Sequence, residues 1–234
     1  MQRSVGTSSR FIVLPRVIVT EAVATVRLGL WPLGWLRPLP APPRPETGRP
    51  IVLVHGFLGH PEMWRTLTRR LYENHLGPVH AVGYPSTRFA IDEIARRIHR
   101  AVVPLAAQGP IDVVGHSLGA VATRAWLKRF GGASYVRRFI SLGGPHAGTD
   151  FYRFAPSVLW PVLNPEGYWP KLLAQDPEPV ETVVIRSRYD QHVVPPVRAA
   201  LPGIEEIVLS GGGHNGLLWS RESCDAVIEV LKRD

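Results

Sequence analysis

The pentapeptide Gly115-His116-Ser117-Leu118-Gly119 joins two segments of different hydrophobic periodicity. Residues 111–114 before it are apolar apart from one aspartate, as in a buried strand, and residues 120–129 after it repeat apolar side chains at helical spacing. A Gly-x-Ser-x-Gly sequence between a strand and a helix is typical of a nucleophile elbow, a tight turn that presents its serine outward. Glycine is expected at both ends of the turn because larger side chains would collide with neighbouring backbone. The stretch therefore predicts a reactive Ser117 at the carboxyl end of a strand.

Predicted strands and helices alternate along the chain on both sides of this turn. Such alternation predicts an α/β fold, in which a mostly parallel sheet of about six strands carries helices on both faces. Ligands then bind at the carboxyl ends of the strands. In the helix after the turn, Arg124, Lys128 and Arg129 form the polar face. The expected strands are residues 51–54, 79–82, 111–114, 136–142, 182–186 and 204–209, and the expected helices are residues 61–73, 90–103, 120–129 and 223–232.

Composition and charge narrow the class of protein. The 234 residues are 45% hydrophobic and 20% charged, which is ordinary for a soluble globular domain. The single cysteine, Cys224, excludes an intrachain disulfide and a cysteine-rich metal site. The net charge of +8 is concentrated near the N-terminus, because seven arginines and two glutamates give residues 1–49 a net charge of +5. The sequence has no nucleic-acid-binding motif and no basic stripe with interleaved aromatic residues, so we exclude nucleic acid as a partner.

The chain is expected to divide into an extension, a linker and a catalytic domain. Residues 1–36 form a basic, apolar extension, and residues 37–50 form a linker. The stretch from residue 32 to 50 contains seven prolines, which excludes a helix or a central strand there. Residues 51–234 then form the catalytic domain.

Residues 11–36 are apolar but are interrupted by charges too often for a membrane span, and they lack a clean signal-peptide pattern. Their spacing predicts a basic amphipathic helix from about residue 15 to residue 30. Such a helix could make peripheral membrane contact as an interfacial anchor, could pack on the domain, or could be a degenerate leader peptide. The sequence leaves the choice between secretion and membrane association open, and it contains no pattern that specifies an oligomeric state.

Ser117 needs a base to become a nucleophile, and three histidines lie well past it in the chain. They are His146, His192 and His214. His214 lies in a glycine-rich loop after the last predicted strand, at the expected ligand edge of the sheet. In this architecture the chain order is nucleophile, acid, base. We therefore predict that His214 is the base.

The acid that orients this histidine is predicted to be Asp190, which comes after the expected strand at residues 182–186. Asp150 and Asp176 are alternatives, but neither directly follows a predicted strand, and Asp112 lies inside one. A carboxylate in this position holds the histidine in the tautomer that accepts the serine proton, and it stabilises the imidazolium that forms.

Two backbone N–H groups are expected to stabilise the oxyanion on an attacked carbonyl group. Leu118, directly after the nucleophile, supplies one, and Phe57, in the loop after the first strand, supplies the other. His55 is expected to hydrogen-bond nearby backbone and shape this loop rather than to take part in catalysis. The nine histidines lack the spacing of metal ligands, so neither a metal nor another cofactor is expected.

Together these motifs resemble the α/β-hydrolase family, and within it the small bacterial triacylglycerol lipases and esterases. The likeness covers residues 50–234. The resemblance implies that Ser117, Asp190 and His214 form a catalytic triad, with Phe57 and Leu118 as oxyanion donors. Four stretches carry it, namely residues 54–59 (VHGFLG), 115–119 (GHSLG), 142–149 (LGGPHAGT) and 213–218 (GHNGLL).

The chain departs from the minimal lipases of this family at residues 149–181, which form a longer segment rich in aromatic side chains. This segment could be a partial cap over the site or a long loop with its own packing. We favour a partial cap, in which Trp160, Tyr168 and Trp169 bind the substrate in an acyl pocket. The secreted members of the family also have a clear signal peptide, which residues 1–36 do not show.

The expected activity is hydrolysis of carboxylic esters, either lipid or acylglycerol esters or small esters, through an acyl-enzyme on Ser117. A thioesterase or an acyltransferase is the alternative, because both would use the same three residues and differ only in the leaving group or the acceptor. A non-catalytic, membrane-associated binding protein on the same scaffold is less favoured, because every catalytic position is filled.

Overall fold

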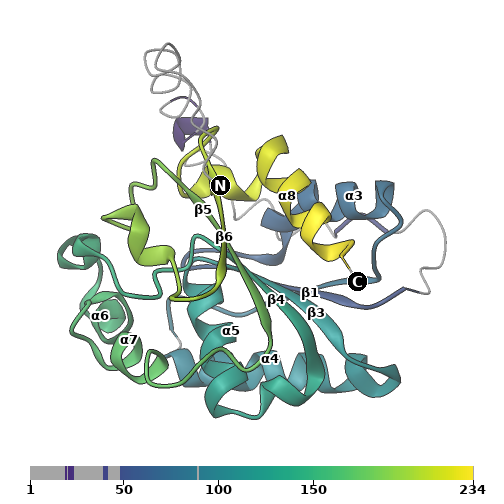
Figure 1. Cartoon of the computed structure of the whole chain (residues 1–234), viewed down its shortest axis with the longest axis horizontal. Helices are drawn as coiled ribbons and strands as arrows, with labels where there is room; N and C mark the ends of the chain where they lie inside the picture. The colour runs from purple at the N-terminus through teal and green to yellow at the C-terminus, as the bar shows by residue number, and fades with distance from the viewer. Residues whose placement is uncertain (1–18, 20, 24–38, 42–47, 89, 234) are drawn as a thin grey trace.

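The computed structural model describes residues 19, 21–23, 39–41, 48–88 and 90–233, and these contain one parallel sheet (Figure 1). The strand order is β2-β1-β3-β4-β5-β6, and all neighbouring pairs are parallel. The predicted α/β fold with a parallel sheet is confirmed. The strands are β1 (Ile51–Val54), β2 (Val79–Val82), β3 (Ile111–His116), β4 (Val136–Leu142), β5 (Glu181–Ser187) and β6 (Glu205–Leu209).

Helices cover both faces of this sheet. In Figure 1, α4 (Ile91–Leu105) and α5 (Leu118–Arg129) lie below it, and α3 (Arg65–Glu73) and α8 (Arg221–Leu231) lie above it. Each face has its own hydrophobic core, which contains the fully buried Trp126 on the α5 side and the fully buried Trp64 on the α3 side. The central strands are therefore apolar on both faces, which is why they read as continuous hydrophobic runs.

Several element boundaries differ from the predicted ones, and two of them lie beside a proline. The segment predicted as one helix at residues 61–73 begins as a 3-10 turn, η2 (Pro61–Trp64), and becomes α-helical only at α3. Proline at the first position suits a helix start, since its missing N–H would have no partner there. Helix α4 continues past the predicted residue 103 to Leu105, with Pro104 in its last turn.

Only part of the N-terminal prediction falls on described residues. Val19 and residues 21–23 are helical, and the rest of the helix predicted at residues 15–30 lies outside the described residues. In the linker, residues 39–41 and 48–50 contain neither helix nor strand. Within the described ranges, no helix combines the length and the hydrophobicity needed to cross a membrane.

Residues 149–181, which we call the cap segment, fold into short helices beside α5 at the left of Figure 1. Arg124 and Lys128, on the polar face of α5, have side chains buried beneath them, whereas Arg129 is exposed. Nη2 of Arg124 lies 2.6 Å from Oε1 of Glu178, and Nζ of Lys128 donates a 2.6 Å hydrogen bond to the carbonyl oxygen of Leu173. The helices are η5 (Asp150–Phe154), η6 (Ser157–Leu159), α6 (Trp160–Leu163) and α7 (Tyr168–Leu173).

Candidate active site

Ser117 lies in a strained turn between β3 and α5. Its backbone has φ 54° and ψ −125°, a conformation that costs a non-glycine residue energy and is found mainly at functional sites. The flanking glycines are required by close backbone contacts. A Cβ atom at Gly115 would lie 2.8 Å from Cα of Ala120, and one at Gly119 would overlap the carbonyl oxygen of His55. The predicted tight turn with obligatory glycines is confirmed.

The structure brings the side chains of Ser117, His214 and Asp190 into one chain of hydrogen bonds. Oγ of Ser117 lies 2.8 Å from Nε2 of His214, and Nδ1 of His214 lies 2.8 Å from Oδ2 of Asp190. The three residues follow β3, β6 and β5, so the carboxyl edge of the sheet positions all of them. Asp190 and His214 are buried, which shields their hydrogen bond from water.

Burial and neighbouring charges shift the pKa values of Asp190 and His214 in opposite directions. Burial alone would raise the pKa of Asp190, but the neighbouring His214 and the backbone N–H groups of Val193 and His192 lower that pKa below its ordinary value. Burial alone would lower the pKa of His214, yet the Asp190 carboxylate, with help from Glu21, raises it above 6.5. The aspartate is therefore ionised and the histidine is a stronger base than free imidazole, as proton abstraction from a serine requires.

Two further histidines flank His214. The Nε2–H of His116 donates a 3.1 Å hydrogen bond to the carbonyl oxygen of His214, and burial lowers the pKa of His116 to about 3. The ring centroid of His192 lies 4.8 Å from that of His214, and burial lowers the pKa of His192 to about 4. Both rings are neutral at pH 7, so neither repels the imidazolium that would form on His214. The position of His116 inside the Gly-x-Ser-x-Gly motif was a signal that could have identified it from the sequence.

The alternative aspartates lie in ion pairs elsewhere. Asp150 pairs with Arg198, Asp176 with Arg129 and Asp112 with Arg137, at nitrogen–oxygen distances of 2.8, 2.9 and 2.8 Å. Of the aspartates considered, Asp190 is the one that the structure places against His214.

The loop after β1 lies directly against Ser117. A Cβ atom at Gly56 would be only 2.8 Å from Cβ of Ser117, so the backbone next to Phe57 closely approaches that side chain. Leu118 is the first residue of α5, where a backbone N–H has no acceptor within the helix. Nδ1 of His55 donates a 2.9 Å hydrogen bond to the carbonyl oxygen of Gly56, which confirms its predicted role in shaping this loop.

A cavity of about 550 Å³ opens at Ser117, a volume within the usual range for small-molecule sites. Phe57 and Leu118, the two predicted oxyanion donors, contribute to its wall, as do His192 and His214. The cap segment supplies apolar side chains, namely Phe151, Phe154, Ala155, Pro156, Leu159 and Leu163. The wall is thus mainly apolar around one polar, reactive corner.

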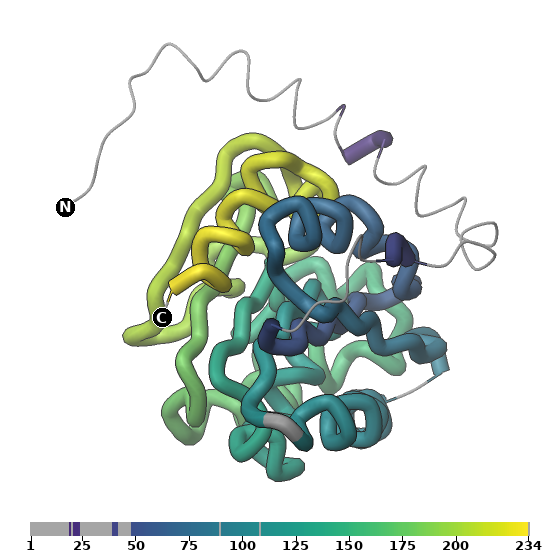
Figure 2. The backbone as a smooth tube through the Cα atoms, turned by 90° about the vertical axis from the view of Figure 1, so that its right-hand side faces the viewer, coloured from purple at the N-terminus to yellow at the C-terminus, as the bar shows by residue number. Residues whose placement is uncertain are grey.

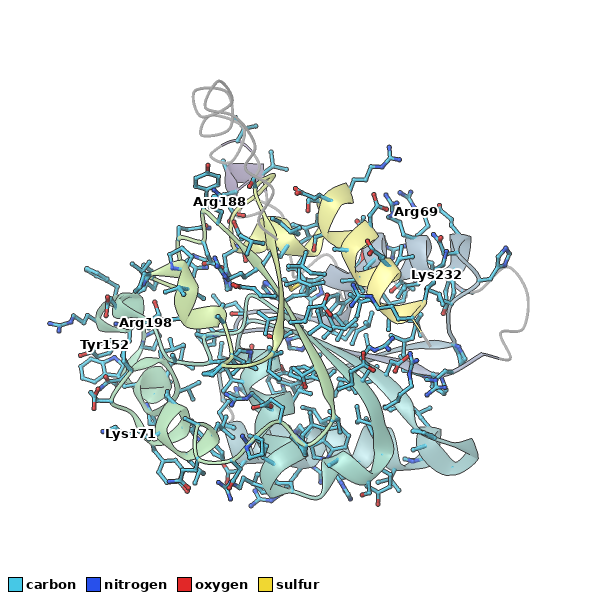
Figure 3. All side chains as sticks on the ribbon, viewed as in Figure 1. Arg69, Tyr152, Lys171, Arg188, Arg198 and Lys232 are labelled. Atoms are coloured by element: carbon cyan, nitrogen blue, oxygen red, sulfur yellow. The ribbon has the colours of Figure 1, made fainter. Side chains whose placement is uncertain are left out.

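The structure does not bring the three predicted substrate-binding aromatics to this cavity. Trp160 donates its indole N–H to the carbonyl oxygen of Ala155 and packs edge-on against Tyr152, which lies on the outer side of the cap segment in Figure 3. Tyr168 and Trp169 begin α7 and pack against each other. None of these three rings lines the cavity, and Phe151, Phe154, Leu159 and Leu163 line it instead.

Metal-ligating side chains do not cluster in the described part of the chain, where no group of three or more His, Cys, Asp or Glu residues could hold an ion. The arrangement at the sheet edge places a serine hydroxyl, a buried imidazole and a carboxylate in one hydrogen-bonded chain beside a mainly apolar cavity.

The fold is similar to that of several solved structures. A lipase from Bacillus licheniformis, BlEst2 in its mature form, is 16% identical, with a TM-score of 0.63 over 83% of this chain and 96% of that chain. A monoacylglycerol lipase from Paleococcus ferrophilus is 15% identical, with a TM-score of 0.61 over 79% and 95%. A thermophilic esterase from Thermogutta terrifontis is 17% identical, with a TM-score of 0.54 over 80% and 90%. At such identities the likeness shows the α/β-hydrolase fold.

Comparison with curated protein sequences gave no match. The family model described as palmitoyl protein thioesterase matches residues 50–196, from the start of β1 through Ser117 and Asp190. That model spans more than half of the chain. The protein therefore belongs to the palmitoyl protein thioesterase family and is an α/β-hydrolase of the esterase, lipase and thioesterase type.

Proposed function

We propose that the protein is a serine hydrolase that cleaves carboxylic esters of apolar acyl chains, with Ser117, His214 and Asp190 as its catalytic triad. The observation that carries this proposal is the continuous chain of 2.8 Å hydrogen bonds from Asp190 to Ser117, which ends at the polar corner of an apolar cavity. A charged or strongly polar acyl group would lose its hydration in that cavity without gaining partners. The proposed substrates are therefore lipid esters.

The proposed reaction has two halves. Ser117 Oγ forms a bond to the carbonyl carbon while its proton moves to Nε2 of His214, and the N–H groups of Phe57 and Leu118 stabilise the resulting oxyanion. The carbon–oxygen bond to the leaving alcohol then breaks as His214 returns the proton to that oxygen. Water, deprotonated by His214, attacks the acyl-enzyme in the same way and releases the fatty acid and Ser117.

Thioester hydrolysis is the second candidate, and the family match favours it. The same steps apply, but the bond that breaks is carbon–sulfur and His214 protonates a thiolate. Thiolates leave readily, so the difference between the candidates lies in how well the cavity mouth accepts each leaving group. An acyltransferase would again use the same acyl-enzyme, with an alcohol replacing water.

A matched pair of substrates separates the first two candidates. One peptide carries palmitate on a serine oxygen, and the second has the same sequence with palmitate on a cysteine sulfur. We expect Ser117-dependent release of palmitate from the oxygen ester. A higher kcat/KM for the sulfur ester would select the thioesterase, and no Ser117-dependent release from either would overturn both. Added glycerol that captures the acyl group instead of water would indicate a transferase.

The length of the acyl chain is tested with esters from acetyl to palmitoyl. Because the cavity wall is apolar, we expect kcat/KM to rise with chain length until the chain fills the cavity. A rate that is independent of chain length would show that the cavity does not bind the acyl group.

We further propose that residues 11–36 make peripheral membrane contact beside the catalytic domain of residues 51–234. Val19 and Val23, one helical turn apart, are 62% and 50% exposed, so this part of the helix presents apolar side chains to solvent. Arginines at positions 16 and 27 would add attraction to anionic lipid. We expect deletion of residues 1–36 to reduce binding to anionic vesicles. Equal binding by the full chain and the deletion variant would exclude this contact.

A further inference from the structure

Glu21, far from the catalytic residues in sequence, contacts the loop that carries His214. Its Oε1 accepts a 2.6 Å hydrogen bond from the backbone N–H of Gly216, and its Oε2 accepts a 3.2 Å hydrogen bond from the N–H of Asn215. The side-chain amide of Gln191 also donates to Oε2 of Glu21. Figures 1 and 2 show the short described helix of residue 21 on the outside of the domain, beside these loops.

The loop has a glycine where the Glu21 side chain approaches. A Cβ atom at Gly213 would lie 2.6 Å from Cγ of Glu21 and would overlap Oε1 of Gln191. Any other residue at position 213 would push both side chains away. The glycine directly before His214 thus provides the space for this contact, which explains one member of the glycine run at residues 211–213.

The contacts of Glu21 continue to the backbone of His214. Gln191, which Glu21 holds through its amide, accepts a 3.1 Å hydrogen bond from the backbone N–H of His214. On the other side, His116 donates to the carbonyl oxygen of His214. The peptide groups before and after the imidazole are therefore both held, and Glu21 holds the following two residues as well.

We infer that Glu21 is a positioning residue, which fixes the His214 loop so that the imidazole stays aligned between Asp190 and Ser117. This inference rests on the proposed function of that site. It assigns to the N-terminal segment a part in catalysis that is independent of membrane contact. Glu21 does not line the substrate cavity, so its effect is on the turnover of bound substrate.

The charge of Glu21 also affects the pKa of His214. The titratable groups that face His214 are Asp190, Glu21, His116 and His192. Asp190 contributes most to raising the pKa of His214, and Glu21 raises this pKa further. The two neighbouring histidines are neutral and add no charge beside His214. Removal of the Glu21 carboxylate therefore lowers the pKa of His214, and the acidic limb of kcat/KM moves to lower pH.

Three variants separate these effects. Glu21→Ala removes the charge and the hydrogen bonds, and Glu21→Gln removes the charge but keeps one acceptor oxygen. Glu166→Gln is the matched control, because Glu166 pairs with Lys171 on the exposed side of the cap segment. Each is measured for kcat, KM and pH profile with a palmitoyl ester, after titration of active sites with a fluorophosphonate. Hydrogen exchange of the amides of Asn215 and Gly216 is measured alongside.

We expect Glu21→Ala to lower kcat about tenfold at unchanged KM, because a displaced base loses alignment with the serine. Glu21→Gln should lose less kcat and show the same shift of the acidic limb. The amides of Asn215 and Gly216 should exchange faster in Glu21→Ala than in wild type, and Glu166→Gln should match wild type throughout.

Wild-type kinetics and exchange in Glu21→Ala would overturn the inference, as would a loss explained wholly by a smaller titrated fraction of active sites. These outcomes are distinct from failure of the proposed function. In that case the wild-type protein itself would show neither fluorophosphonate labelling of Ser117 nor ester turnover, and the positioning role would fall with it.

Discussion

The carboxyl edge of β3, β5 and β6 and the cap segment meet at the same cavity, but sequence and structure are related differently in the two regions. At the sheet edge, each chemical group follows directly from a strand end, and its position is set by the parallel register. In the cap segment, short helices with no repeated periodicity decide which side chains reach the cavity. Residue type predicts the position of a side chain where the backbone is constrained by a sheet. It predicts little where the packing of short helices decides which way a side chain points.

Buried charge shows the same contrast. Asp190 and His214 form a buried, hydrogen-bonded pair next to Ser117, whereas Arg124, Lys128 and Glu178 form a buried ion cluster that attaches the cap segment to α5. The pair ends at the cavity, and the ion cluster lies beneath the cap segment. We therefore expect changes in the two clusters to affect different measurements.

The largest effect should follow removal of the nucleophile. Ser117→Ala is expected to lower kcat by about 10⁶-fold, since only binding and oxyanion stabilisation remain. The melting temperature should not fall, because the side chain makes no contribution to either core. Residual activity near that of wild type would mean that the sheet edge does not carry the reaction.

The second largest effect should follow Asp190→Asn, with a loss in kcat of about 10⁴-fold, because the wrong tautomer of His214 is then favoured. Wild-type kcat/KM should fall in acid with a midpoint above pH 6.5, since Asp190 raises the pKa of His214 above that value. As pH drops through this pKa, His214 gains a proton and can no longer act as a base. In Asp190→Asn the midpoint should move to lower pH. An unchanged midpoint in the pH–rate profile would contradict the coupling of the two residues.

The buried ion cluster of Arg124, Lys128 and Glu178 is tested by measuring the stability of the protein. Glu178→Gln leaves Arg124 and Lys128 buried without their counter-charge, and we expect a loss of about 3 kcal/mol in the free energy of unfolding. The exposed pair of Glu166 and Lys171 is the control, and Glu166→Gln should leave the urea midpoint unchanged. Equal midpoints for both variants would show that the buried ion cluster does not hold the cap segment.

The smallest expected effect concerns the cavity face of the cap segment. Phe154 lines the cavity and Tyr168 does not, yet both are aromatic and largely exposed, at 82% and 63%. Phe154→Ala should raise KM for palmitoyl esters about three- to tenfold through lost apolar contact, with no change for acetyl esters. Tyr168→Ala should behave as wild type. The opposite ranking would restore Tyr168 as a substrate contact.

Much of the fold could be predicted from the sequence, because strands covered on both faces are continuous hydrophobic runs. The predicted bounds of β1, β2 and β4 match the structure. The placement of Ser117, Asp190 and His214 in one hydrogen-bonded chain could also be predicted, from strand ends and chain order. Phe57 is predicted as an oxyanion donor from its place in the loop after the first strand, and in the structure β1 pairs directly with β3, the strand that leads to Ser117.

Other features could not be predicted, for physical reasons that are specific to each. The contact of Glu21 with Gly216 joins residues 195 positions apart, and no local pattern encodes it. Trp160 and Tyr168 were chosen for their aromatic character, but the direction of a side chain on a one-turn helix depends on its neighbours. Basic residues at helical spacing on the polar face of α5 do not reveal that Glu178 pairs with Arg124 and Lys128 and that these two side chains are buried.

The central claim is that Ser117 is the acyl-accepting nucleophile, and covalent labelling tests it most directly. The full chain and its Ser117→Ala and His214→Ala variants are treated with a fluorophosphonate, and the modified peptide is identified by mass spectrometry. We expect one adduct on Ser117 in wild type, none in Ser117→Ala, and much slower labelling in His214→Ala. Ester hydrolysis by a wild-type protein that carries no adduct on Ser117, or carries it on another residue, would contradict the account.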